Sequence, residues 1–249
     1  MCSKIVFLEI IPGKICLKIS LNYNSNFCSL VEIKYPVHKN PTSCNNLFTL
    51  LPKKSFNENK LKVVKIKQLK GVIVEYDLYS KTFFYKCPEN IYLFDSMLRV
   101  VCSIIFAKNN TLILHSAGIL KSQRFCEIYA GATNSGKSTL AKKFSAKYVL
   151  SDELCPVSVE GKKVVSWRSL FYSEVTPEVN FKKKFLVDDI AFLLRRKDSL
   201  VPKKLSIKEL DTKKAIKFLL KNVFWVVKNN NFSKDIFNTV VKVVNLLQK

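Results

Sequence analysis

The sequence predicts an α/β protein with a layered core around a mixed sheet, an N-terminal β-rich portion and C-terminal covering helices. A glycine-containing loop at 131–136 separates a strand-like segment from a helix-like one. Period-two alternation of apolar residues dominates the first 86 residues, and helical periodicity dominates the last 44. With 249 residues, the chain can hold a core domain and an appendage. We expect two parts, 1–86 and 87–249.

Short strands and turns are predicted for the first part. Residues 15–21 and 61–67 alternate apolar with polar side chains, as half-buried strands do, and 72–79 and 82–87 are further candidates. Prolines and asparagines indicate a loop over 36–46. This portion shows no pattern that carries chemistry, and His38 in its loop receives no role.

Helices and strands alternate in the second part. Apolar spacing predicts a helix over 91–106, strands over 111–115 and 125–130, and an amphipathic helix over 137–147 before a strand over 148–153. Ser206 and Glu209 form a capping-box pattern that predicts the start of a helix reaching Val223, and another helix begins near Ser233.

The strongest motif lies after the strand at 125–130. It fits the Walker A pattern G-x-x-x-x-G-K-[ST] and consists of Gly131, Ala132, Thr133, Asn134, Ser135, Gly136, Lys137, Ser138 and, one residue on, Thr139. The two glycines let successive backbone N–H groups point at phosphate oxygens. Lys137 neutralises β- and γ-phosphate oxygens, and the Ser138 hydroxyl suits Mg²⁺. We expect a site for ATP with Mg²⁺.

Two acids follow at a short distance. Asp152 comes 15 positions after Lys137, and Glu153 follows it. One short helix fits between, so both acids are expected on the neighbouring strand, where they can ligate Mg²⁺ or take a proton from an attacking hydroxyl. His115, at the end of the strand ahead of the loop, is by itself more typical of a structural histidine.

In this order, the motifs resemble the HPr kinase/phosphorylase-like family of P-loop serine kinases. The resemblance is carried by Leu114-His115, the loop Gly131–Leu140 and Leu150-Ser-Asp-Glu. It implies an HPr kinase/PEP carboxykinase-like fold and transfer of the γ-phosphoryl group of ATP to a serine-like hydroxyl. Asp152 then matches the acid/base residue and Glu153 a second acid, both near the metal. His115 matches the histidine that supports the site.

The chain also departs from that family. Its second acid is Glu where the family has Asp, and the later Glu-Ile-Arg-Gly segment of the full-length enzymes is missing. The resemblance therefore does not extend to HPr as the substrate or to the reverse reaction. Glu174 is a speculative substitute metal ligand. Family members often form homo-oligomers, and no residue pattern here indicates an interface.

Charge and cysteines limit the other function classes. The chain carries 42 Lys+Arg against 19 Asp+Glu, a formal charge of +23, but the lysines are spread along its length, which favours a solvated surface over a nucleic-acid partner. Eight cysteines without close pairs are typical of reduced, buried thiols rather than a zinc site. No apolar run suits a signal peptide or membrane span, so a cytoplasmic protein is expected.

Three functions stay open at this level. The first is an ATP-dependent kinase with a peptide, protein or small-molecule acceptor, in which Asp152 acts as acid/base. The second is a non-catalytic ATP-binding module. The third, motivated only by the charge of +23, is an ATPase associated with nucleic acid.

Overall fold

The computed structural model describes residues 2–35, 37–38, 46–52, 62–65, 71–77, 79–180, 183–195, 202–225 and 230–249. It is a mixed α/β structure that divides into two compact units, Met1–Cys102 and Ser103–Lys249. The expected division lay after residue 86. The structural division falls instead inside the helix α2 (Ile91–Ala107), whose first residues belong to the first unit.

The first unit is a seven-stranded mixed sheet with the strand order β3-β1-β2-β4-β7-β6-β5. Its described elements are β1 (Cys2–Ile11), β2 (Ile15–Tyr23), α1 (Ser25–Lys34), β3 (Val37–His38), β4 (Asn46–Pro52), β5 (Lys62–Lys65), β6 (Ile73–Asp77) and β7 (Thr82–Lys86). Strand β4 runs parallel to both of its neighbours, and the other pairs are antiparallel. The β-rich character agrees with the sequence pattern, while most of the expected loop 36–46 lies outside the described residues.

Helix α1 was not predicted. It begins after Asn24, whose side chain accepts a hydrogen bond from the Phe27 amide, and its buried residues are Phe27, Cys28 and Val31. The ring of Phe27 packs edge-on against Phe94 of α2. The helical spacing of apolar residues in α1 continues over too few positions to be distinguished from the strand patterns on either side.

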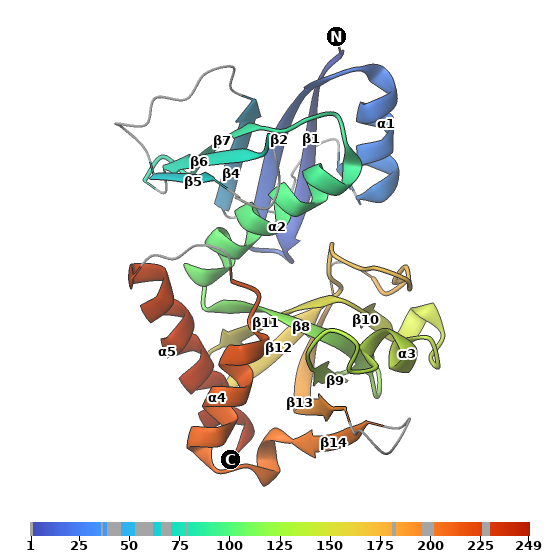
Figure 1. Ribbon diagram of the computed structural model, residues 1–249, viewed down its shortest axis with the longest axis vertical. Helices are drawn as coiled ribbons and strands as arrows, with labels where there is room; N and C mark the ends of the chain where they lie inside the picture. Colours follow the sequence, from blue (N-terminus) through green and yellow to red (C-terminus); the bar gives the residue numbers. More distant parts are fainter. Residues whose placement is uncertain are drawn as a thin grey trace. The chain divides into compact units, whose positions relative to one another are not determined.

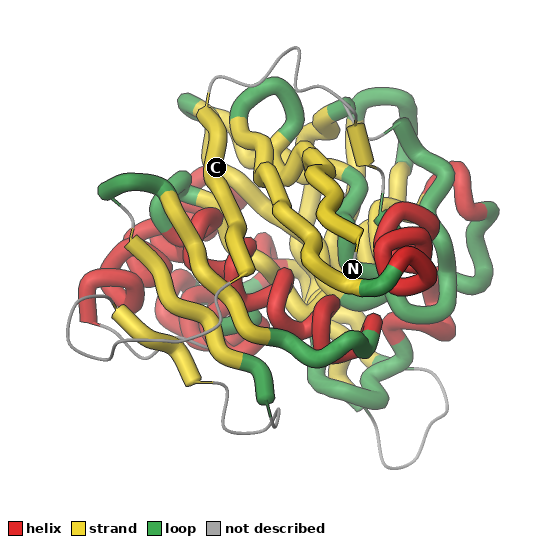
Figure 2. Tube along the Cα trace, turned by 90° about the horizontal axis from the view of Figure 1, so that it is seen from above, coloured by secondary structure: helices red, strands yellow, loops and turns green. Residues whose placement is uncertain are grey.

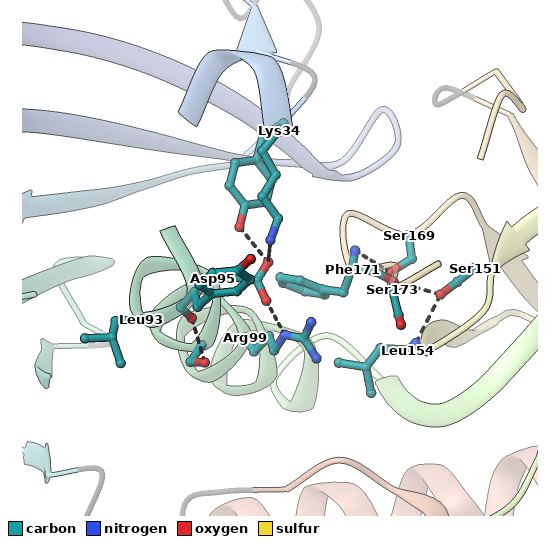
Figure 3. Close-up of polar contacts among 12 residues, drawn as sticks. Lys34, Leu93, Asp95, Arg99, Ser151, Leu154, Ser169, Phe171 and Ser173 are labelled. Carbon is teal, nitrogen blue, oxygen red and sulfur yellow. Dashed lines mark hydrogen bonds and ion pairs between the residues drawn. The ribbon is translucent and has the colours of Figure 1, made fainter. Parts of the chain in front are cut away.

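A buried carboxylate joins the two helices of the first unit. Asp95 of α2 accepts hydrogen bonds from the Tyr35 hydroxyl at 2.7 Å and from Arg99 Nε at 2.6 Å, and Lys34 Nζ lies 3.1 Å away (Figure 3). Burial and the Asp95 charge raise the pKa of the Tyr35 phenol. The cluster satisfies a charge that would otherwise be costly to bury.

The second unit contains the predicted motifs. Its elements are β8 (Thr111–Leu120), β9 (Phe125–Ala130), α3 (Lys137–Ala141), β10 (Val149–Ser151), β11 (Leu154–Glu160), β12 (Lys163–Trp167), β13 (Lys184–Leu194), β14 (Lys203–Ser206), α4 (Thr212–Asn222) and α5 (Asn230–Leu247) (Figure 1). Single 3₁₀ turns lie at Ala146–Tyr148 and Ile207–Glu209.

Five strands of this unit close into a small barrel. Strand β9 pairs with β8 on one side and, in parallel, with β13 on the other, while β8, β11, β12 and β13 pair in succession. Figure 2 shows the strands of the chain in yellow and its helices in red. The expected layered sheet is therefore closed on itself, because β9 supplies hydrogen bonds to two strands that would otherwise be separated.

Helices cover the barrel. Helix α5 packs on β8, β11 and β12 and also against α4. Helix α3 packs on β8, where Ala141 joins a buried cluster with residues of β8, β9, β10 and β13: Ala117, Ile119, Tyr129, Val149, Ala191 and Leu193. This apolar contact fixes the helix that follows the glycine loop.

Two helix predictions need correction. Helix α3 ends at Ala141 instead of residue 147, because the Lys143 and Phe144 amides turn back to Leu140 and Ala141 in i→i−3 bonds. The capping box at Ser206 forms, but it caps the 3₁₀ turn at 207–209, and α4 begins later with Asp211 as its N-cap.

Most of the cysteines in the described part of the chain are buried. Cys28, Cys87, Cys102, Cys126 and Cys155 are buried free thiols as expected, whereas Cys16 is disulfide-bonded, against expectation. No helix in the described part of the chain combines the length and the apolar character that a membrane crossing requires.

Candidate functional site

Strand β8 brings the three sequence motifs together. Its Ser116 pairs with Ala130 of β9 on one side, and the Ser116 amide donates to the Glu153 carbonyl on the other. One residue earlier in β8, the His115 carbonyl accepts a hydrogen bond from the Gly131 amide, and His115 pairs with Leu154 of β11. Because neighbouring strands lie about 4.8 Å apart, the glycine loop and the acidic pair are about 10 Å apart across β8.

This arrangement corrects two expectations. The acids were expected on the strand next to β9, but β8 lies between, and β9 and β10 are both antiparallel to it. His115 was expected at a strand end and instead lies in the middle of the ten-residue β8. By alternation, His115 faces the same side as Ala117 and Ile119, which pack with α3.

The loop from Gly131 to Gly136 has the backbone that its glycines permit. Gly136 is left-handed, with φ 95°, and so is Asn134, with φ 63°. A Cβ on Gly131 would collide with the Ser135 hydroxyl and come within 3.0 Å of the Leu193 carbonyl oxygen. The loop therefore turns tightly around Gly131, and no side chain caps the first turn of α3.

The Ser135 hydroxyl is the unsatisfied group of this loop. Ser135 is 5% exposed, and its Oγ has no hydrogen-bond partner in the described part of the chain. A buried hydroxyl without a partner costs about 1–3 kcal/mol. An anion accepted by the loop would supply the missing acceptor.

Lys137 lies folded over the loop. Its Nζ donates to the carbonyl oxygens of Gly131 at 2.9 Å and of Ala132 at 2.7 Å. Burial lowers the pKa of this ammonium group, and the nearby negative charge of Glu153 opposes that shift. The Lys137 ammonium group therefore lies against the loop carbonyls and near Glu153.

Asp152 is 1% exposed, and its carboxylate is already heavily engaged. Oδ1 accepts from the Ser173 amide at 2.8 Å, and Oδ2 accepts from the Glu174 and Val175 amides at 2.8 and 3.3 Å. An ionised carboxylate has about four acceptor positions, so one is left on Oδ1. The backbone carbonyl of Asp152 accepts a weak hydrogen bond, 3.5 Å long, from the Ser138 hydroxyl.

Further contacts tie residues 169–175, which we call the Asp152-bound segment, to the site. The Ser151 hydroxyl donates to the Phe171 carbonyl at 2.8 Å, and the Phe171 amide donates to the Ser169 hydroxyl at 3.0 Å (Figure 3). Val175 packs against the cluster that holds α3. Glu174, the speculative metal ligand, instead forms an ion pair with Lys142 just after α3.

The oxygen groups beside the loop are of the kind that Mg²⁺ binds. Among the described residues, no group of three or more His, Cys, Asp or Glu side chains is arranged to hold a metal ion. Mg²⁺ commonly takes only one or two protein oxygens and completes its shell with water and phosphate. The Ser138 hydroxyl, the remaining Oδ1 position of Asp152 and the half-buried Glu153 fit that requirement.

Sequence reasoning missed a second buried network on β9. Glu127 accepts hydrogen bonds from the Tyr129 hydroxyl and from Lys204 Nζ, the latter at 3.4 Å, and Asp189 accepts one from Ser206 at 2.8 Å. Burial raises the pKa of Glu127, but the Tyr129 hydrogen bond and nearby lysines outweigh it and lower the pKa. The pairing of β9 with β13 brings Glu127 beside Asp189. The spacing of residues along the sequence does not predict this pairing.

Protein-family models and curated proteins point to no relative of this chain. No protein-family model matches the chain, and no curated protein matches it significantly. The function must therefore be argued from the site itself.

Proposed function

We propose that the chain is an ATP-dependent kinase that transfers the γ-phosphoryl group to a serine-like hydroxyl of a peptide, protein or small molecule. The observation that carries the proposal is the loop Gly131–Thr139. In this loop Gly136 has a left-handed backbone, the Lys137 ammonium group donates to a loop carbonyl, and the Ser135 hydroxyl has no partner among the described residues. A bound phosphate would accept hydrogen bonds from both side chains.

The nearby groups support transfer rather than binding alone. Lys137 can leave the loop carbonyls and neutralise phosphate oxygens, because a phosphate can accept the two hydrogen bonds that its Nζ donates to Gly131 and Ala132. Ser138 with Asp152 or Glu153 would hold Mg²⁺, which would supply positive charge for the phosphate oxygens. With Mg²⁺ on Ser138 and Glu153, the remaining Oδ1 position of Asp152 can accept the proton of an acceptor hydroxyl. His115 adjoins both motifs through its backbone.

One observation favours the second candidate, an ATP-binding module without transfer. Three backbone amides already use most of the Asp152 carboxylate, so its main role in the free protein is to hold the Asp152-bound segment. In that case nucleotide binds, but no acceptor is phosphorylated.

Nucleotide binding with and without Mg²⁺ is the decisive experiment. We expect wild type to bind ATP, and Lys137→Ala to lose binding by at least about tenfold because a phosphate loses its cation. Lys143→Ala is the matched control, since Lys143 is an exposed lysine shortly after the loop. No binding by wild type would overturn the proposal.

Phosphoryl transfer is then measured against a panel of hydroxyl acceptors. Glu153→Gln and Asp152→Asn are compared after circular dichroism and urea unfolding have shown each variant to be folded. Binding of ATP without any transfer, by wild type and variants alike, would select the non-catalytic module.

A further inference from the structure

The Asp152-bound segment carries a hydroxyl of its own beside the proposed site. Ser173 is exposed, and its amide donates to Asp152 Oδ1 at 2.8 Å. Three bonds of about 1.5 Å join N to Oγ, so the hydroxyl lies within about 7 Å of the carboxylate oxygen that keeps a free acceptor position. Figure 3 shows Ser173 next to Ser169 and Phe171.

The same segment is held next to the phosphate loop. Asp152, which anchors it, also accepts the Ser138 hydroxyl hydrogen bond through its backbone carbonyl. Glu174 pairs with Lys142, and Val175 packs against the buried cluster to which Ala141 belongs. The segment is therefore attached both to the residue proposed as base and to the helix that follows the loop.

We infer that Ser173 is an internal phosphoacceptor, so that the protein phosphorylates itself on this hydroxyl. The inference rests on the proposed kinase function and names a modification site for it. Holding the hydroxyl on a fixed segment beside the base removes the entropy cost of bringing in a separate acceptor.

The reaction balances with ATP as the phosphoryl donor. Ser173 Oγ forms a bond to the γ-phosphorus, and the bond from that phosphorus to the bridging oxygen breaks. The hydroxyl proton passes to Asp152 Oδ1, and ADP leaves with the electron pair of the broken bond. Neither an oxidant nor a further reactant is needed.

Phosphorylation of Ser173 would change the segment itself. The phosphoserine adds a charge of about −1.5 to −2 beside the Asp152 carboxylate and the exposed Glu174. The phosphate would repel these two carboxylates and weaken the hydrogen bonds from the amides of 173–175 to Asp152. These amides should therefore exchange with solvent faster in the phosphorylated chain.

The test incubates the purified full chain with Mg²⁺ and ATP and locates the phosphate by peptide mass spectrometry. We expect one phosphoryl group on Ser173, formed at a rate that does not depend on protein concentration. Ser173→Ala should lose this label, Ser173→Thr should recover it as phosphothreonine, and Thr176→Ala, an exposed hydroxyl three residues on, should be labelled like wild type.

Each other outcome overturns the inference in an identifiable way. Equal labelling of Ser173→Ala places the phosphate elsewhere, and a rate that rises with protein concentration excludes an internal acceptor. Transfer to an external hydroxyl without a label on Ser173 overturns the inference and leaves the proposed function standing. ATP binding that depends on Lys137, with no transfer to Ser173 or to any external hydroxyl, overturns the inference and selects the non-catalytic module. No binding of ATP overturns both.

Discussion

Replacing Asp152 by Asn tests whether this carboxylate is a structural anchor as well as a chemical group. Asn offers one carbonyl oxygen where Asp offers two. If that oxygen takes the Oδ2 position, the Glu174 and Val175 amides keep an acceptor, but the Ser173 amide then faces the NH₂ group of Asn. One hydrogen bond is lost, and the other two change from a charged to a neutral acceptor.

The expected loss of stability follows from these contacts. A hydrogen bond to a charged group contributes about 1.5–3 kcal/mol, and a buried unsatisfied donor costs about 1–3 kcal/mol. Because Asp152 is 1% exposed, an Asn side chain at this position cannot use water to satisfy its own polar atoms. Asp152→Asn should therefore lower the free energy of unfolding by about 2–5 kcal/mol.

Urea unfolding of wild type and variant measures this difference. The control is Asp188→Asn, the same chemical change at a half-exposed carboxylate that pairs with Lys208 at 3.5 Å, for which a loss of at most about 1 kcal/mol is expected. An Asp152→Asn loss below about 0.5 kcal/mol would refute the anchoring role, because surface-like substitutions fall in that range.

Three further predictions concern other described residues. Gly131→Ala should destabilise the protein by about 1–3 kcal/mol and weaken ATP binding in a titration, because its methyl group meets Ser135; added Ser135→Gly should recover part of the loss. Asp95→Ala removes the acceptor of the buried Tyr35 hydroxyl and a partner of the partly buried Lys34 and Arg99, and should cost about 3–5 kcal/mol in urea unfolding. Burial raises the pKa of Cys155 to about 12 and that of Cys126 well above the ordinary thiol value, so neither thiol should react with a maleimide at pH 8 until the chain unfolds.

Much of the second unit was predictable because its signals are local. The strand before Gly131, the loop itself and the short spacing to Asp152 follow from residue types within about 25 positions of one another. Helix α2 was predicted to within one residue at its C-terminal end, since its apolar spacing continues over 17 residues.

The parts that were missed depend on contacts between distant segments. The barrel closes through the pairing of β9 with β13, whose partners Glu127 and Asp189 are 62 positions apart in the sequence. The amides of 173–175 that bind Asp152 have no side-chain signature at all. Backbone donors are common to nearly every residue, so only the fold can show which of them a carboxylate will meet.

The position of β8 has a consequence for how the chain can vary. This strand sets the spacing between the glycine loop and the acidic pair, because both are hydrogen-bonded to His115 and Ser116 or paired with them. Changes of length in the connections 121–124 and 142–148 leave that spacing intact, whereas one residue inserted in β8 would turn its following side chains to the opposite face. Loop grafts and chain permutations should therefore be made in those connections, with β8 kept whole.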